Sequence, residues 1–186
     1  MTRTTSLLLC TLLVASATAR DATHLLLDGQ LRTTTGGLEE SRLVVYRDGR
    51  PLMTLDQGLH HFQLELELGY DYLLRFTARD RIAKSLHIDA HVPHAQAPHR
   101  RPQFDFLVTL EPQRPGEVAY YFGPVGFIRF DARVGCFDYD PTYRAALIVK
   151  PEMPGRRMVD PFPDPTLELG QWVEERLDLT AIRDPD

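Results

Sequence analysis

Residues 62–77 read FQLELELGYDYLLRFT, and the alternation in this stretch decides the fold class. Apolar residues stand at every second position on both sides of Gly69-Tyr70-Asp71. In an extended chain, successive side chains point to opposite faces, so each half predicts a strand with one dry and one wet face. We expect the two strands to form a β-hairpin that turns at residues 69–71. The alternation indicates a scaffold rather than a catalytic core.

Short apolar segments of the same kind lie on both sides of this stretch. They predict further strands at residues 25–32, 42–46, 51–55, 82–89 and 104–110, separated by turn residues such as Asp48-Gly49. The strand at 51–55 begins with Pro51, which lacks an N–H and favours an edge position. Seven strands at short spacing predict an antiparallel β-sandwich over residues 20–112.

Residues 113–149 form a second, strongly aromatic segment. A strand is expected at residues 118–122, a hairpin at residues 126–130 and 136–139, and a further strand at residues 145–149. This segment is interpreted as a C-terminal hairpin extension of the sandwich.

Residues 150–186 differ in composition from the rest of the chain. The segment from Lys150 to Pro165 contains five prolines, which indicate an extended linker. Residues 166–179 carry apolar side chains at near-helical spacing around Trp172, so a short amphipathic terminal helix is expected.

Residues 1–19 have the features of a secretory signal peptide. Arg3 precedes an apolar run over residues 7–14, and residues 17–19 read Ala-Thr-Ala, a typical cleavage site. The run is too short to cross a bilayer, so no transmembrane segment is expected after cleavage. The protein is therefore expected to be exported, either to the periplasm, to the outer membrane or to the cell surface.

Charge and cysteine content narrow the class of protein further. The net charge of −5 becomes −6 when Arg3 leaves with the signal peptide, and no basic run is present. Such a chain lacks the positive patch that nucleic-acid binding requires. Cys10 leaves with the signal peptide, so Cys136 is alone and no intramolecular disulfide is possible.

The histidines are the weak candidates for a metal site. His87, His91 and His94 lie close to Asp89 in the sequence, and imidazole with carboxylate suits zinc. The spacing matches no metal motif, and His87 is expected on the outward face of its strand. A solvated loop is the favoured interpretation, so no metal and no cofactor are expected.

No catalytic residue is predicted. No nucleophile motif is present, and Cys136 is expected to be a buried, inert thiol in an apolar hairpin. Asp131, Asp138 and Asp140 are suitable calcium ligands but are more typical of an exposed strand face. A paired-carboxylate hydrolase stays open because acidic residues are common in the chain.

The aromatic residues of the second half are the candidate binding residues. Their rings suit stacking on a sugar or anchoring a protein partner, although they would equally fill a small core. The candidates are Tyr120, Tyr121, Tyr139, Tyr143 and Trp172.

The order of these blocks resembles carboxypeptidase regulatory-like domains. The resemblance covers residues 24–145 and is carried by Leu26-x-x-Gly29-x-Leu31, Leu43-Val44-Val45-Tyr46, Phe62-x-Leu64-x-Leu66, Tyr70-x-Tyr72-x-Leu74 and residues 82–89, which include Lys84. A later block, Phe137-Asp138-Tyr139-Asp140, is similar to a subgroup found in Gram-negative envelope proteins. The chain departs from the family pattern at Leu55-Asp56-Gln57-Gly58 and at Arg79-Asp80-Arg81.

This resemblance implies a seven-stranded, transthyretin-like (prealbumin-like) β-sandwich that acts as an accessory module, and it transfers no catalytic residue. The function expected first is an exported, non-catalytic interaction or structural module of the bacterial cell envelope, bound to an envelope protein or glycan. A carbohydrate-binding module is the alternative, and a metal-dependent hydrolase is the second alternative. Exposed, coplanar tyrosine rings would favour sugar, whereas a contiguous apolar patch would favour protein.

Overall fold

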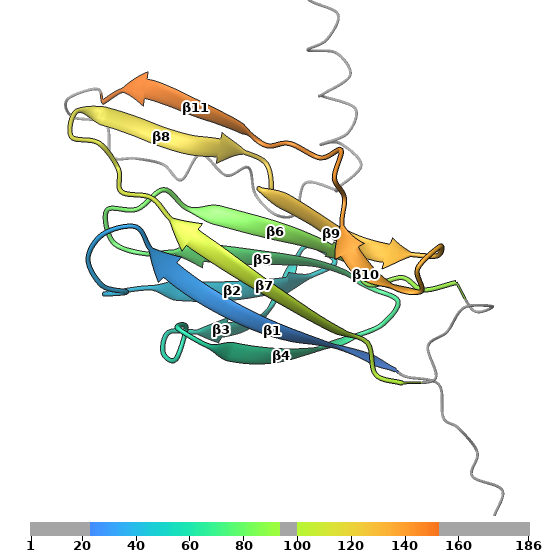
Figure 1. Ribbon diagram of the computed structural model, residues 1–186. Coiled ribbons are helices and arrows are strands. Elements are labelled where there is room, and N and C mark those ends of the chain that lie inside the picture. The colour runs from blue at the N-terminus through green and yellow to red at the C-terminus, as the bar shows by residue number, and fades with distance from the viewer. Residues whose placement is uncertain (1–22, 94–99, 153–186) are drawn as a thin grey trace, which may run out of the picture.

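The computed structural model describes residues 23–93 and 100–152, which form eleven strands and no helix (Figure 1). The strands are β1 (His24–Thr33), β2 (Arg42–Arg47), β3 (Arg50–Leu55), β4 (Phe62–Glu67), β5 (Asp71–Thr77), β6 (Lys84–Asp89), β7 (Gln103–Leu110), β8 (Glu117–Phe122), β9 (Gly126–Asp131), β10 (Cys136–Tyr139) and β11 (Ala146–Pro151). In this part of the chain, no helix is long and apolar enough to cross a membrane.

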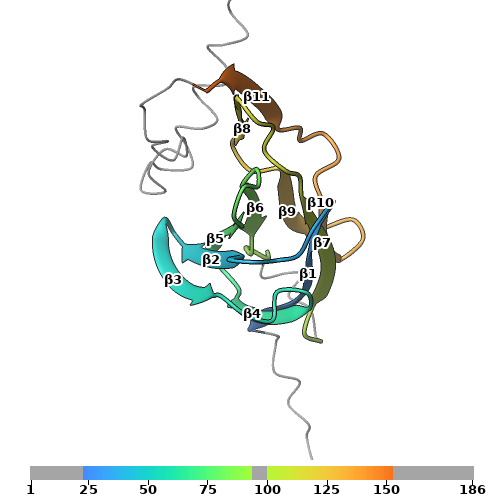
Figure 2. The same ribbon diagram turned by 90° about the vertical axis from the view of Figure 1, so that its left-hand side faces the viewer.

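Two sheets pack face to face around one core. The smaller sheet has the strand order β4-β1-β7, and the larger has the order β10-β9-β6-β5-β2-β3. Figure 2 shows the strands of the two sheets together, with a separate two-stranded ribbon, β11-β8, set apart from them. The all-β, sandwich-like class expected from the alternation is confirmed.

Residues 62–77 form two strands as expected, but the predicted hairpin is wrong. β4 pairs antiparallel with β1 in the smaller sheet, whereas β5 pairs with β2 and β6 in the larger sheet. The chain crosses between the sheets at residues 68–70, where the Leu68 N–H donates to Thr23 and the Gly69 N–H donates to Ala90. Alternation sets the dry face of each strand but not its partner, and both dry faces meet in the same core.

The core consists of apolar side chains at alternate positions of the facing strands. Phe62, Phe76 and Phe106 form its aromatic centre, with ring centroids 5.9–6.3 Å apart. Gly29 on β1 lies against Phe62 and Phe106, so the space that a side chain would need at this position is filled by their rings. This packing explains why a strand interior carries glycine there.

The sandwich differs from the predicted antiparallel, seven-stranded one. In the described residues its two sheets hold nine strands, because the 126–139 hairpin joins the larger sheet through a parallel pairing of β9 with β6. β7 also pairs in parallel with β1. The sequence predicts strands but not these pairings, since each joins segments that are far apart in the chain.

One prediction for the ends of the chain can be compared with the structure, and three others concern residues that are not described. The strand expected at 145–149 is present as β11, and it continues through Lys150 and Pro151, which had been assigned to the linker. The signal peptide at 1–19, the remaining linker and the terminal helix around Trp172 lie outside the described residues.

Candidate binding site

A cavity of about 290 Å³ lies between the outer edge of β7 and the strands β6 and β9. Its volume is at the lower end of the range typical of ligand pockets. Its other wall is formed by Tyr139, the last residue of β10, and by the segment that follows it up to Arg144. The lining residues are Lys84, Leu86, Leu107, Val108, Thr109, Val125, Gly126, Tyr139, Asp140, Pro141, Tyr143 and Arg144.

Among the described residues, no strand pairs with the β7 edge that faces this cavity. The carbonyls of Pro102 and Leu110 point toward β1, where they accept from Leu26 and Thr34. The main-chain groups of the odd-numbered residues between them therefore point away from β1. The Thr109 carbonyl accepts from Lys84, and in the described chain no strand pairs with β7 on this side.

Leu107 lies in the middle of this edge and was not predicted as a site residue. Its side chain is 48% exposed and lines the cavity. The sequence does contain a signal for it, because Leu107 is apolar at an outward position between Asp105 and Thr109. Single exposed leucines are common on protein surfaces. Leu107 is therefore a candidate binding residue only because it lines the cavity.

Lys84 holds the two sheets together at the inner end of the cavity. Its Nζ donates to the Thr109 carbonyl at 2.6 Å and to the Glu111 carboxylate at 2.8 Å. The same ammonium lies 5.4 Å from the ring centroid of Tyr121 on β8. Lys84 therefore connects β6, β7 and the β8–β11 ribbon, a role that sequence reasoning did not assign to it.

Tyr139 and Tyr143 are the two predicted binding residues that the structure brings together. Tyr139 packs edge-on against Phe104 of β7, with ring centroids 5.2 Å apart, and burial raises the pKa of its hydroxyl. Tyr143 lies against Phe127 at a centroid distance of 6.2 Å. Both rings line the cavity. A side chain at Gly126 would meet Leu86 and Tyr139 within 3.0–3.3 Å, so glycine keeps this space open.

Asp140 fixes the turn that carries Tyr143. Its carboxylate accepts from the Thr142 hydroxyl at 2.6 Å and from the Thr142 N–H at 2.9 Å, and it pairs with Arg129 at 3.2 Å. The hydrogen bonds from Thr142 lower the pKa of Asp140, and the Arg129 charge adds to them. The cavity rim thus carries one carboxylate and, at Arg144, one guanidinium.

The other predicted binding residues lie elsewhere. Tyr120 and Tyr121 are neighbours on β8, so their rings point to opposite faces of the ribbon. Lys150 lies over Tyr120 at 5.5 Å, and Lys84 lies over Tyr121. The four tyrosines therefore do not form one coplanar platform. Trp172 lies outside the described residues.

His87 is buried, contrary to the expectation that it faces solvent. It lies on the outer face of β6 as its register requires, but Phe127 on the neighbouring β9 covers its ring at a centroid distance of 4.6 Å. Its Nε2 lies 3.1 Å from the Asp71 carboxylate. This hydrogen bond is the main cause of the lowered pKa of Asp71.

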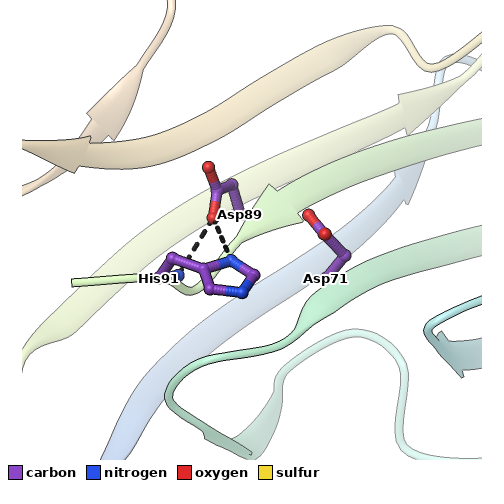
Figure 3. A group of neighbouring side chains, drawn as sticks. All are labelled: Asp71, Asp89 and His91. Carbon is purple, nitrogen blue, oxygen red and sulfur yellow. Dashed lines mark hydrogen bonds and ion pairs between the residues drawn. The ribbon is translucent and has the colours of Figure 1, made fainter. Parts of the chain in front are cut away.

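Within residues 23–93 and 100–152, the groups best placed to hold a metal ion are Asp71, Asp89 and His91, shown in Figure 3. One ligand atom from each residue lies within 4.8 Å of the others. His91 bonds the Asp89 carboxylate at 2.7 Å through its ring, while His87 bonds Asp71. The ligand types suit a divalent cation. Each carboxylate is already hydrogen-bonded to an imidazole, however, so the same side chains are equally suited to stabilising the fold without an ion.

The predicted metal candidates do not converge in a pocket. His87 and His91 face different carboxylates, and neither residue lines the cavity beside β7. His94 lies outside the described residues. The metal-dependent hydrolase alternative requires histidine and carboxylate side chains that converge in a pocket. His87 and His91 do not meet this requirement.

Two other predictions concern the β9–β10 hairpin. The Asp131 and Asp138 carboxylates accept from the main-chain N–H groups of Arg133 and Tyr139, so both already take part in local hydrogen bonds. Cys136 is exposed rather than buried, because the inward position on this short strand belongs to Phe137.

Comparison with known proteins assigns no family. No family model matches the chain, and no curated protein matches it. Among solved structures, a DUF3823 family protein from Parabacteroides merdae is similar at 15% sequence identity and a TM-score of 0.31. The match covers 73% of this chain, which spans 62% of the length of that protein. A likeness this low identifies neither family nor function.

Proposed function

We propose that this protein is an exported, non-catalytic module of the bacterial cell envelope that binds an extended segment of another protein in the cavity beside β7. The observation that carries this proposal is the edge of β7 at Leu107, which pairs with no described strand and forms one wall of the cavity. A peptide that adds a strand to such an edge gains main-chain hydrogen bonds, and side-chain pockets give it specificity.

The other walls of the cavity suit a peptide side chain. Leu86, Val108 and Val125 contribute apolar side chains to the cavity lining, and the rings of Tyr139 and Tyr143 line it as well. Tyrosine is frequent in binding surfaces because it combines a large apolar ring with a hydroxyl. The rim charges of Asp140 and Arg144 would orient the polar parts of the bound segment.

Export is supported by the signal-like residues 1–19. The resemblance to carboxypeptidase regulatory-like domains supports an accessory role. The proposal assigns no reaction to the protein.

The test is peptide selection on residues 20–186 with a displayed library of linear peptides, followed by measurement of the selected peptides by fluorescence anisotropy. We expect Leu107→Pro to weaken binding by about tenfold or more, because proline removes the outward N–H. Leu107→Ala keeps that N–H and is the matched control. Tyr143→Ala is a second variant that leaves β7 unchanged and is also expected to weaken binding.

If peptides bind equally well to Leu107→Pro and to the unaltered protein, binding by strand addition at this edge is wrong. Thermal unfolding of each variant shows whether the fold is retained. The β1–β7 ladder runs through Phe106 and Val108, so it does not need the Leu107 N–H.

A carbohydrate-binding module is the second candidate, favoured by the presence of Tyr139, Tyr143, Asp140 and Arg144 around one cavity. Sugars bind to aromatic rings flanked by such polar groups. Glycan-array binding that is lost in Tyr139→Ala and Tyr143→Ala but kept in Leu107→Pro would support this candidate over the first.

A further inference from the structure

The outer edge of β11 is unpaired within the described residues, and its apolar side chains are exposed. β11 pairs antiparallel with β8 and with no other described strand. Leu147 and Val149 are 48% and 51% exposed. An apolar strand edge of this kind is a template for pairing with another strand.

The hydrogen bonds of the ribbon show which β11 residues face outward. The Gln113 side chain bonds both the N–H and the carbonyl of Ala119, so the odd-numbered residues of β8 face away from β11. The Glu152 N–H donates to the Gly116 carbonyl, so the even-numbered residues form the bonded pairs. Leu147 lies opposite Tyr121 and Val149 opposite Ala119. The main-chain groups of Leu147 and Val149 therefore point to the outer edge.

We propose that β11 pairs antiparallel with β11 of a second copy of this chain, about a twofold axis at Ile148. In this register Leu147 of one copy lies opposite Val149 of the other, and the two residues exchange main-chain hydrogen bonds on both sides of the axis. The β8–β11 ribbons of the two copies then form one continuous sheet in the order β8-β11-β11-β8.

The sequence of β11 is complementary to itself in this register. Leu147 meets Val149, Ile148 meets Ile148, and Ala146 meets Lys150, so no like charges lie directly opposite one another. Just beyond the ends of β11, the same register continued outward would place Glu152 of one copy opposite Arg144 of the other. Opposite charges at facing positions stabilise strand pairs, whereas like charges destabilise them.

The ribbon itself gains from such pairing. A two-stranded ribbon is marginally stable in water, and β8–β11 has no ladder to either sheet of the sandwich. Its described side-chain attachments include the Gln113–Ala119 bonds and the Lys84–Tyr121 contact. A second ribbon would bury Leu147 and Val149 and satisfy their outward main-chain groups. Pro151 lacks an N–H, which limits the length of the new ladder.

Lys150 does not oppose this arrangement. Its ammonium lies over the ring of Tyr120 on the same ribbon, 5.5 Å from the centroid, so the side chain is directed along its own strand pair. Within β11 no other charged residue is present. The edge therefore lacks the outward charges by which natural sheets prevent pairing.

The first test is sedimentation velocity of residues 20–186 over a range of protein concentrations. We expect a monomer–dimer equilibrium that Val149→Asp or Leu147→Lys weakens by about tenfold or more. The double variant Leu147→Lys with Val149→Asp places Lys opposite Asp across the axis and is expected to restore the dimer. Rescue of this kind depends on the register and would not follow from a general loss of folding.

The second test is disulfide trapping in a Cys136→Ser background. Two non-hydrogen-bonded partners lie about 4.5 Å apart at Cα, which suits a disulfide. Ile148→Cys places a thiol opposite its own copy and is expected to cross-link on mild oxidation. Leu147→Cys lies opposite Val149 of the other copy and is the control that should not cross-link.

The proposal is overturned if the full chain stays monomeric at every concentration, or if Leu147→Cys cross-links as fast as Ile148→Cys. A monomer would mean that the edge does not self-associate, whether another protein or residues 153–186 of the same chain occupy it. Peptide binding beside β7 is measured independently, so either proposal can fail while the other holds.

Discussion

Lys84 donates to the main-chain carbonyl of Thr109 across the gap between the two sheets, at 2.6 Å. Its side chain is only 12% exposed, so the ammonium lies in a largely buried position between β6 and β7. The bond uses one of the outward carbonyls of the β7 edge and leaves Leu107 as the next outward residue along the cavity. Lys84 thus sets where the unpaired part of the edge begins.

Replacing Lys84 by methionine should destabilise the protein by about 1–3 kcal/mol, since the Thr109 carbonyl and the Glu111 carboxylate lose a charged donor. The chain contains one other lysine, Lys150, whose side chain lies over Tyr120 on the exposed ribbon. Lys150→Met is therefore the matched control, with an expected change within about 0.5 kcal/mol. Urea unfolding of both variants measures the difference. Equal midpoints for the two variants would show that Lys84 does not stabilise the sheet contact.

Replacing Gly29 by alanine should destabilise the core by about 1–3 kcal/mol through overpacking. A Cβ at this position would lie 2.8 Å from the Phe106 ring and closer still to the Phe62 ring. Gln30→Ala changes the adjacent residue, whose side chain bonds Arg32 outside the core, and should have little effect. Thermal unfolding of the pair is the measurement. A Gly29→Ala variant as stable as Gln30→Ala would mean that the two phenylalanine rings move aside without cost.

The positions and faces of the strands could be predicted from alternation alone. Gly29 and Phe62 show the limit of that prediction. Their strands are neighbours in one sheet, but residues 62–77 on their own favoured a hairpin within the stretch. Strand partners are chosen by contacts between distant segments, and the period-two pattern is satisfied by either pairing.

The candidate site could be predicted only in part, for the same reason. Tyr139 and Tyr143 are close in sequence and were identified together, whereas Lys84 and Leu107 reach the cavity from strands that pair elsewhere. The burial of His87 depends on Phe127, forty residues further along the chain. The residue pattern of one strand does not indicate which side chain from a distant segment will cover that strand.

The pair formed by Asp71 and His87 predicts a dependence of stability on pH. The hydrogen bond from His87 lowers the pKa of Asp71 below its ordinary value of 3.8, and the nearby His91 acts in the same direction. A carboxyl with a lowered pKa in the folded state stabilises the fold above its unfolded pKa. That contribution is lost as the pH falls through the folded pKa.

Asp71→Asn should therefore reduce stability near neutral pH, and the difference from the unaltered protein should shrink as the pH falls below about 3.8. The measurement is urea unfolding at neutral pH and at roughly pH 3. Asp105→Asn removes an exposed carboxylate on β7 and is the control, with little expected change at either pH. A difference between Asp71→Asn and the unaltered protein that grows on acidification would contradict the assignment.

Cys136 should react with a thiol reagent in the folded protein. It is exposed on β10, while its neighbour Phe137 is buried, so the alternation of this strand turns the thiol toward solvent. The measurement is the rate of modification by Ellman's reagent under native conditions and in denaturant. In a Cys136→Ser background, Ser85→Cys places a thiol at a fully buried position of β6 and is expected to react only after unfolding. If Cys136 also reacts only after unfolding, the inward and outward faces of β10 are exchanged. Tyr139, three positions along the same strand, would then no longer be placed to line the cavity.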